Sequence, residues 1–467
     1  MRYISTRGAA PSLDFAAVTL AGLASDGGLY VPEVWPTLTQ AEIANLRGLP
    51  YPELAARIMQ PFVGDSLAPE RLRELTTQAY ARFAHAAVTP LIQLDQRHWL
   101  LELFHGPTLA FKDVALQLLG LLFEEFLARD DSRLTVVGAT SGDTGSAAID
   151  ALAGRERVEI FMLHPAGRVS DVQRVQMTTV RAPNVHNIAV EGASFDDCQA
   201  MVKRLFADPA MTARHRIGAV NSINWARLMA QVVYYFAAAL QLGAPEQKVA
   251  FSVPTGNFGD VFAGYVAARM GLPIERLVVA TNVNDILHRA LSEGDYSTGT
   301  VTPTAAPSMD IQVSSNFERL LFDLGGRDGA VLAAQMAEFD QYRAIRLSEQ
   351  QLAGARELFT SARADAADMA GAMRWAWERC GCEAIDPHTA IGLHAARSLE
   401  WGEGVPVVTL ATAHPAKFRE AVERATGFRP GLPARVGDLF GREERCARLP
   451  NDYEAIRAHI LAVATPL

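Results

Sequence analysis

From about residue 99 onward, short apolar runs alternate with segments that have a helical pattern. The apolar runs predict strands at 99–104, 134–139, 249–253 and 405–411, followed by helices at 111–128, 146–153, 261–270 and 418–426. A polar or glycine-bearing loop separates each strand from its helix. This order predicts an α/β fold with two parallel-sheet domains whose faces are covered by helices. In such folds ligands bind at the carboxyl ends of the strands, where these loops lie.

The first ninety or so residues have a different pattern, with helical stretches at 15–24 and 70–83 and many Pro and Gly residues between them. We therefore expect a small N-terminal domain over residues 1–95. An α/β catalytic region of two intertwined subdomains should follow over 96–440, with its ligand in the cleft. Residues 441–467 contain no recognisable motif and are expected to form a C-terminal extension. A chain of 467 residues has room for two or three domains.

Charge and cysteine content exclude several classes of function. The net charge is −9, which argues against a nucleic-acid or membrane-surface partner, since both need a cationic face. No apolar run approaches the length of about 18 residues that a membrane span needs. The four cysteines, Cys198, Cys380, Cys382 and Cys446, have no zinc-ligand spacing, so we expect free thiols and no metal site. A cytoplasmic protein is predicted, as a monomer or homodimer.

The loop at residues 255–260 follows a short apolar strand and opens a helix. Glycines allow a close approach of the backbone to a ligand, and the free N–H groups of a helix start attract anions. The loop is therefore a candidate phosphate site, although it matches neither GxGxxG nor the Walker pattern. An ordinary strand-to-helix turn is the alternative.

A second loop, at residues 140–145, carries three side chains with hydroxyls, one carboxylate and two glycines at a helix start. Hydroxyl and N–H donors in this arrangement suit a carboxylate ligand. The alternative is a helix cap, with Asp143 or Thr144 as the N-cap residue.

Lys112 lies at the start of an apolar helix, where burial and the helix dipole both lower the pKa of an amine. A neutral amine is what Schiff-base chemistry requires. The alternative is a lysine whose ammonium group extends to solvent.

An imine-forming amine, a phosphate site and a carboxylate site together are what pyridoxal phosphate and an amino acid would need. Thr412, in the loop that follows the strand at 405–411, could hydrogen-bond the pyridine nitrogen of this cofactor. Pyridoxal 5'-phosphate is therefore the predicted cofactor.

Residues 105–113 (HGPTLAFKD) resemble the Schiff-base lysine motif of the bacterial and fungal branch of the threonine synthase family. Further stretches resemble the same family in the same order, at residues 26–32, 140–145, 221–227, 255–260, 308–311, 386–390 and 412–417. The resemblance covers most of the chain and implies fold type II of the pyridoxal-phosphate enzymes. It also implies conversion of O-phospho-L-homoserine and water to L-threonine and phosphate, as the last step of threonine biosynthesis.

The resemblance assigns roles residue by residue. Lys112 matches the lysine that binds the cofactor covalently, and we predict that it also moves the substrate's Cα proton. The cofactor's phosphate is assigned to Gly256, Asn257, Phe258, Gly259 and Asp260, and its pyridine nitrogen to Thr412. The substrate's carboxylate is assigned to Thr140, Ser141, Asp143 and Thr144, and its phosphate to Asn221, Ser222 and Arg227. The exact contact of Asp143 is left open, because an anion beside a carboxylate is repulsive.

Ser314 departs from the family pattern, in which Pro is expected, and we expect a local change of the turn that touches no assigned role. Possible pocket roles of His105, Asp310, His388 and Lys417 stay open. Two other functions are considered. A dehydratase of the same fold would release ammonia and needs no second phosphate site. A non-catalytic relative would bind a phosphorylated metabolite without needing Lys112.

Overall fold

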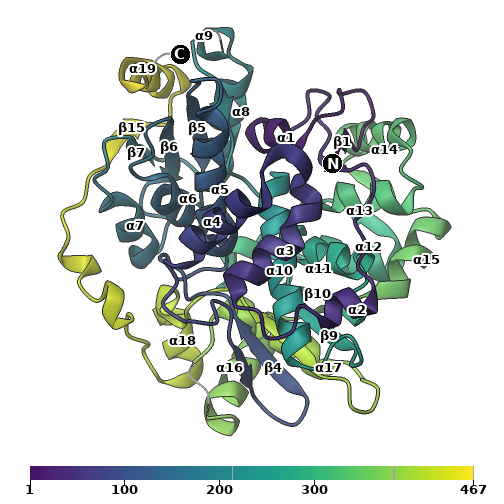
Figure 1. The fold of residues 1–467 in the computed structure, drawn as a ribbon. Helices are drawn as coiled ribbons and strands as arrows, with labels where there is room; N and C mark the ends of the chain where they lie inside the picture. The colour runs from purple at the N-terminus through teal and green to yellow at the C-terminus, as the bar shows by residue number, and fades with distance from the viewer. Residues whose placement is uncertain (213, 382–383, 466–467) are drawn as a thin grey trace.

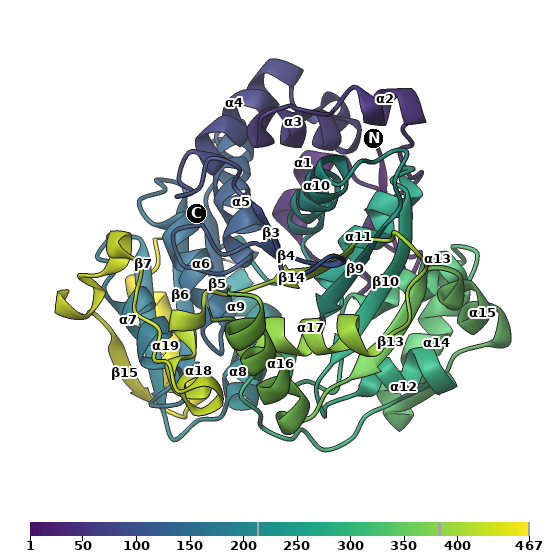
Figure 2. The same cartoon turned by 90° about the horizontal axis from the view of Figure 1, so that it is seen from below.

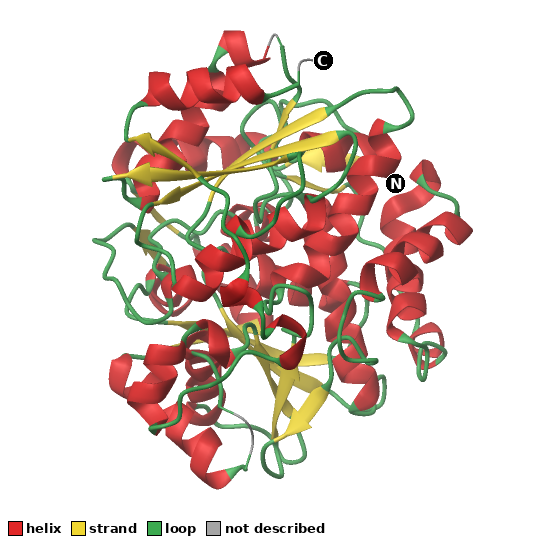
Figure 3. Cartoon of the chain, turned by 90° about the vertical axis from the view of Figure 1, so that its left-hand side faces the viewer, coloured by secondary structure: helices red, strands yellow, loops and turns green. Residues whose placement is uncertain are grey.

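Two sheets of mainly parallel strands form the framework, as the alternating pattern predicts (Figure 1). The computed structural model describes residues 1–212, 214–381 and 384–465; Cys382, one of the predicted free thiols, lies outside them. Figure 3 shows the two sheets at opposite ends of the molecule with a layer of helices between them. The predicted α/β fold with two parallel-sheet units is confirmed.

The smaller sheet is entirely parallel among the described residues, and its strands follow the order β15-β7-β6-β5-β8. These strands are Ala447–Pro450, Val185–Glu191, Val158–Pro165, Leu134–Ala139 and Ile217–Gly218. The helices associated with this sheet are α6 (Asp143–Leu152), α7 (Asp171–Thr178), α8 (Phe195–Ala207), α9 (Pro209–Thr212) and α19 (Tyr453–Val463). The C-terminal residues, which carry no motif, thus supply the edge strand β15 and a covering helix.

The larger sheet has the strand order β13-β10-β9-β14-β4-β3, and β3 alone runs antiparallel to its neighbour within the described residues. Its strands are Phe359–Arg363, Ile274–Thr281, Val249–Pro254, Val407–Ala411, His98–Glu102 and Leu91–Gln93. Around it lie α11 (Gly259–Arg269), α12 (Ile286–Glu293), α13 (Phe317–Leu324), α14 (Gly329–Tyr342), α15 (Glu349–Leu358), α16 (Ala366–Arg379), α17 (Pro387–Ser398) and α18 (Arg419–Thr426). A short ribbon pairs β11 (Asp295–Ser297) with β12 (Ala344–Arg346).

Helices α5 (Lys112–Leu127) and α10 (Trp225–Gln241) occupy the centre of the molecule (Figure 2). Nearly every residue of each is buried, which explains why the α5 sequence is apolar on all sides. Both helices begin beside the predicted site, so their first residues are held by the core of the protein.

The N-terminal residues pack directly on this centre. Their elements are β1 (Tyr3–Ser5), α1 (Phe15–Ala21), β2 (Tyr30–Pro32), α2 (Gln40–Ala44), α3 (Tyr51–Val63) and α4 (Pro69–Tyr80). The rings of Tyr3, Trp35 and Phe62 surround that of Trp225 on α10, with centroids 5.8–6.1 Å away. The N-terminal segment therefore shares one hydrophobic core with the catalytic region. The domain boundaries at 95 and 440 stay predictions.

Among the residues that the structure describes, no helix is both long enough and apolar enough to span a membrane.

Candidate active site

Lys112 is the first residue of α5, and its side chain is buried with only 11% exposed. Burial lowers the pKa of its amine to about 8, and the positive charges of Lys417 and Arg227 act in the same direction, while Asp143 opposes them. The alternative of a lysine that extends to solvent does not fit this burial. A buried amine that loses its proton near neutral pH is suited to forming an imine.

The loop before Lys112 is held in place by Asp113. Its carboxylate accepts hydrogen bonds from Thr108 N at 2.8 Å and from Thr108 Oγ1 at 2.7 Å. A Cβ atom at Gly106 would lie 2.4 Å from the Cβ of Asp113, so only glycine fits there. These contacts explain the residue types at the Gly106, Thr108 and Asp113 positions of the motif, because they fix where α5 begins.

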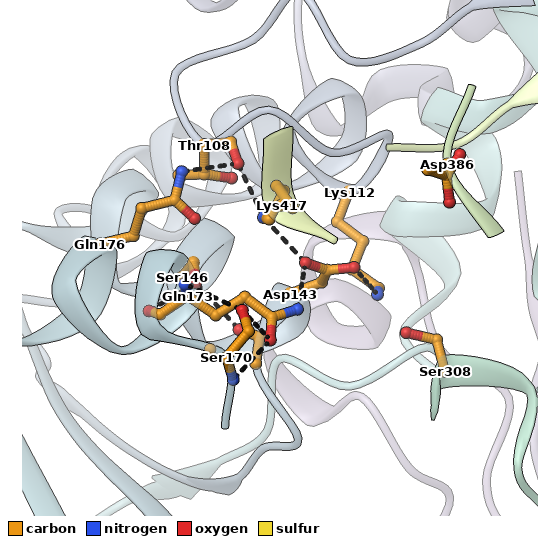
Figure 4. A network of polar contacts seen from close by, with 12 residues as sticks. Thr108, Lys112, Asp143, Ser146, Ser170, Gln173, Gln176, Ser308, Asp386 and Lys417 are labelled. Carbon is orange, nitrogen blue, oxygen red and sulfur yellow. Dashed lines mark hydrogen bonds and ion pairs between the residues drawn. The ribbon is translucent and has the colours of Figure 1, made fainter. Parts of the chain in front are cut away.

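Asp143 lies in the first turn of α6, between two lysines. Its Oδ2 is 3.7 Å from Lys112 Nζ, and its Oδ1 accepts hydrogen bonds from Lys417 Nζ and Gln173 Nε2, each at 2.8 Å (Figure 4). Burial by itself raises the pKa of this carboxyl, but the charges of Lys417 and Lys112 outweigh it and hold the pKa well below its usual range. Asp143 is therefore a charged acceptor engaged with lysines, and it offers no donor to a substrate carboxylate.

The rest of the loop at 140–145 is arranged to leave donors free. The hydroxyl of Thr140 is buried and accepts from the N–H groups of Gly142 and Gly145 at 2.9 and 2.8 Å, so it shapes the loop from within. Gly142 is the N-cap residue of α6 and has no side chain to cap it, so the predicted alternative of an Asp143 or Thr144 cap is wrong. In the first turn only Gly145 N, among the described residues, has a side-chain acceptor, which is Thr140. Ser141 and Thr144 are half-buried, and their hydroxyls make no hydrogen bond to any described residue.

The loop at 255–260 leads from β9 into α11 with an unusually tight backbone. Gly256 lies against the chain, because a Cβ atom added there would be 2.5 Å from the carbonyl oxygen of Ser308. Phe258 is the N-cap residue, has a left-handed backbone with φ of +63°, and packs its ring on Phe317. No side chain caps α11, so its first N–H groups are available to an anion.

Asp260 differs from the other residues of this loop. Its buried carboxyl accepts hydrogen bonds from the hydroxyls of Tyr234 and Tyr235 on α10, and burial raises its pKa to about 7. Its side chain is thus engaged with the core, and only its backbone N–H can serve the predicted phosphate site. Asn257, in contrast, is exposed.

Arg227 lies in the first turn of α10 and is 3% exposed. Its Nη1 donates to the carbonyl of Val220 at 2.9 Å, whereas its buried Nε has no partner. No carboxylate of the described residues forms an ion pair with it, and burial lowers its pKa to about 10. Burying an unpaired charge costs several kcal/mol, and none of the described residues supplies a carboxylate that would offset this cost. Of its predicted partners, Asn221 is exposed and Ser222 is half-buried.

Thr412 follows β14 and lies against the residue that precedes Lys112. Its carbonyl accepts from Phe111 N at 2.8 Å, and its N–H donates to Thr389 Oγ1 at 3.2 Å. Its own hydroxyl makes no hydrogen bond within the described chain. The structure thus brings Lys112, the loop at 140–145, Thr412 and the charge of Arg227 together between the two sheets.

Comparison with known proteins agrees with this geometry. Family models match in three stretches, described as threonine synthase N terminus (residues 2–80), pyridoxal-phosphate dependent enzyme (83–413) and threonine synthase, C-terminal (389–460). A threonine synthase of Pseudomonas aeruginosa is 56% identical over 461 residues, which cover 98% of each chain.

The chain belongs to the threonine synthase family of pyridoxal-phosphate-dependent enzymes.

Solved structures of this family superimpose closely. The crystal structure of a threonine synthase from Brucella melitensis with bound pyridoxal phosphate has a TM-score of 0.96 and 49% identity over 99% of both chains. A yeast threonine synthase has a TM-score of 0.94 and 39% identity over 99% of this chain and 98% of that one. Pyridoxal phosphate is the cofactor of this enzyme family, and its predicted residues here fit it. The uncapped start of α11, the crowded Gly256 and the buried amine of Lys112 match its phosphate and its aldehyde.

In this threonine synthase family member, Asn316 lies between two predicted site segments, although the sequence did not single it out. Its amide Nδ2 donates to the carbonyls of Asn257 at 3.0 Å and Ser222 at 3.2 Å, and Arg319 donates to its Oδ1. Asn316 therefore joins the predicted cofactor-phosphate loop to the predicted substrate-phosphate segment. Only its position two residues after Ser314, where the family pattern has Pro, pointed to this part of the chain.

Ser314 contacts the loop at 255–260 through its side chain. Its hydroxyl donates to the carbonyl of Gly256 at 2.7 Å, and its N–H donates to Tyr296 Oη at 2.8 Å. Proline has neither donor, so the serine makes contacts with Gly256 and Tyr296 that a proline could not make; the prediction that this departure touches no assigned role stays a prediction. The serine adds two contacts that brace the loop at 255–260.

His388, Asp310 and His105, whose roles the sequence left open, each contact other residues of the chain. His388 accepts from the N–H of Ser308 at 3.3 Å and contacts Asp386 at 2.8 Å, which holds the chain that crowds Gly256. Asp310 accepts from side chains of Asn282, Asn284 and Thr304. His105 pairs with Glu102 at 2.7 Å. These three side chains thus have partners within the chain.

Replacing Gly256 by Ala should weaken cofactor binding by about tenfold or more, because the added Cβ displaces the loop from Ser308. Titration of apoenzyme with pyridoxal phosphate, followed by fluorescence, measures this. Gly371→Ala is the matched control, since that glycine lies in helix α16 with open space around it and should not change the affinity. Equal affinities for the two variants would argue against a phosphate site at this loop.

Proposed function

We propose that the protein is a threonine synthase that converts O-phospho-L-homoserine and water into L-threonine and phosphate. The observation that carries the proposal is Arg227, a buried guanidinium without a carboxylate partner among the described residues, whose charge reaches Lys112. The cofactor phosphate is assigned to the start of α11 in this proposal, so Arg227 is available for a second phosphate on the substrate. Arg suits this role because its planar fork contacts two phosphate oxygens at once.

The remaining substrate group is a carboxylate, and the loop at 140–145 supports its binding. The free hydroxyls of Ser141 and Thr144 and the first N–H groups of α6, except that of Gly145, are donors at one place. Thr140 and Asp143 contribute indirectly. Thr140 fixes the backbone of the loop, and Asp143 forms ion pairs with Lys112 and Lys417. The substrate would thus be bound at both ends, with its reacting carbons near Lys112.

Lys112 is proposed to move the protons of the reaction. When bound, pyridoxal phosphate withdraws electrons from the carbon that carries the substrate's amine, which makes the hydrogen on that carbon acidic. An amine whose pKa is about 8 can accept that proton and return one at a neighbouring carbon. The hydroxyl of Thr412 would hydrogen-bond the pyridine nitrogen without protonating it, which favours elimination over transamination.

The products distinguish this proposal from a dehydratase of the same fold. With O-phospho-L-homoserine we expect L-threonine and phosphate in equal amounts, measured by amino-acid analysis and a phosphate assay. Ammonia as the main product, with 2-oxobutyrate from L-threonine or pyruvate from L-serine, would support the dehydratase instead.

A non-catalytic relative that binds a phosphorylated metabolite is the second alternative. It would have no need of Lys112, whose burial is costly. The purified holoenzyme should absorb near the violet edge of the visible spectrum and lose this band on dialysis against hydroxylamine. A cytoplasmic location and a monomeric or homodimeric state stay predictions from the sequence.

A further inference from the structure

Lys417 is a buried lysine that the proposed function leaves without a role. It ends a short 3-10 turn (Pro415–Lys417) five residues after Thr412, and its side chain is 0% exposed. Its Nζ donates to Asp143 Oδ1 and to the carbonyl of Thr108, both at 2.8 Å. Lys417 thus joins the chain after β14 to the first turn of α6 and to the loop before Lys112 (Figure 4).

The contacts of Asp143 are divided between its two oxygens. Oδ1 accepts from both Lys417 and Gln173, while Oδ2 is the oxygen 3.7 Å from Lys112 Nζ. Gln173 is itself held by the capping box of α7, where its Oε1 accepts from the hydroxyl of Ser170 at 3.0 Å. The orientation of the carboxylate toward Lys112 is therefore set by donors on its far side.

We propose that Lys417 is a positioning residue for Lys112: by holding one oxygen of Asp143 and sharing its charge, it limits how strongly the other oxygen binds the Lys112 amine. The inference rests on the proposed role of Lys112 as the lysine that binds the cofactor. It also accounts for an aspartate at this position, because a second lysine keeps the carboxylate from forming a closed pair with the reactive amine.

The charged groups facing Lys112 come from three elements: Asp143 from α6, Lys417 from the turn after β14, and Arg227 from α10. Burial and the two positive charges lower the pKa of Lys112, and Asp143 raises it. Without Lys417, the carboxylate would act on Lys112 alone and the amine would hold its proton to higher pH. Without Asp143, the amine would release its proton at lower pH.

The test measures how fast cofactor-free enzyme reacts with pyridoxal phosphate as a function of pH, followed by visible absorbance. Only the neutral amine reacts, so the rate rises with pH through the pKa of Lys112. Lys417→Met should move this profile about one pH unit upward, and Asp143→Asn should move it downward. The double variant, in which both charges are gone, should return close to wild type. Lys248→Met, at an exposed lysine paired with Glu275, is the matched control and should leave the profile in place.

A Lys417→Met profile that coincides with wild type overturns the inference. So does a rate that is lower at every pH and is not restored in the double variant, since that pattern marks a structural role only. If Lys417→Met does not fold, the comparison of Asp143→Asn with the double variant decides. A higher midpoint in the double variant supports the charge effect of Lys417, and equal midpoints overturn it. Because no threonine is measured, failure of the proposed reaction leaves this test intact, and absence of the absorbance change in wild type would instead mark failure of the Lys112 assignment.

Discussion

Lys112→Ala should lower the rate of phosphate release from O-phospho-L-homoserine by about 1,000-fold or more. The amine is expected both to bind the cofactor covalently and to move the substrate's proton, and general acid–base catalysis alone contributes about 100- to 10,000-fold. Affinity for pyridoxal phosphate should fall by a smaller factor, because Gly256 and the start of α11 remain. Single-turnover phosphate release and a cofactor titration measure the two effects.

Lys248→Ala is the matched control for this variant. Its side chain is 65% exposed and pairs with Glu275 on the surface, so removal should leave both quantities unchanged. Substantial turnover by Lys112→Ala at saturating cofactor would contradict the assignment of the catalytic amine.

Arg227→Met should reduce kcat/KM for O-phospho-L-homoserine by about 30-fold or more, since losing one partner of a buried charge pair costs about 2–5 kcal/mol. Binding of the cofactor should change little, because its phosphate is assigned to α11. The kcat/KM of Arg227→Lys should lie between those of the wild type and Arg227→Met, since a lysine keeps the charge without the planar fork. Steady-state kinetics with varied substrate give these values.

Inorganic phosphate provides an independent readout for the same variant. It should inhibit the wild type competitively and inhibit Arg227→Met much more weakly. Arg57→Met, at a side chain that is 67% exposed, serves as the control. An unchanged kcat/KM for Arg227→Met would remove the observation on which the choice of substrate rests.

The strand–loop–helix order could be predicted because apolar strands and their helices have distinct local patterns. Strand β5 has the predicted limits of 134 and 139, and β9 differs by one residue. Helix α6 begins at Asp143 instead of 146, because the N–H groups of a first turn have no partner within the helix and its residues resemble a loop. Helix α3 was not predicted, since Pro50, Pro52 and Pro61 interrupt its pattern.

In the site, too, residues defined by nearby sequence could be predicted, whereas contacts between distant parts of the chain could not. Lys112 and the loops that follow each strand could be placed, because each lies at a position that its neighbours in sequence define. The partners of Asp143 could not, because Lys417 is 274 positions away in the chain and Gln173 belongs to another helix. Asp260 was assigned by its place in a loop, whereas its carboxyl is directed by two tyrosines of α10. Contacts of this kind depend on how the elements pack together.

Strand β15 has a consequence for the solubility of the protein. It covers β7, which would otherwise present a row of unpaired N–H and C=O groups to other molecules. As the edge strand, β15 is only four residues long and ends in Pro450. It also carries Arg448, whose Nη1 lies 3.6 Å from Glu191 Oε1. Short length, proline and charge all discourage further strand pairing. The final residues thus protect the smaller sheet from self-association, and a chain that ends before them would be expected to aggregate through β7.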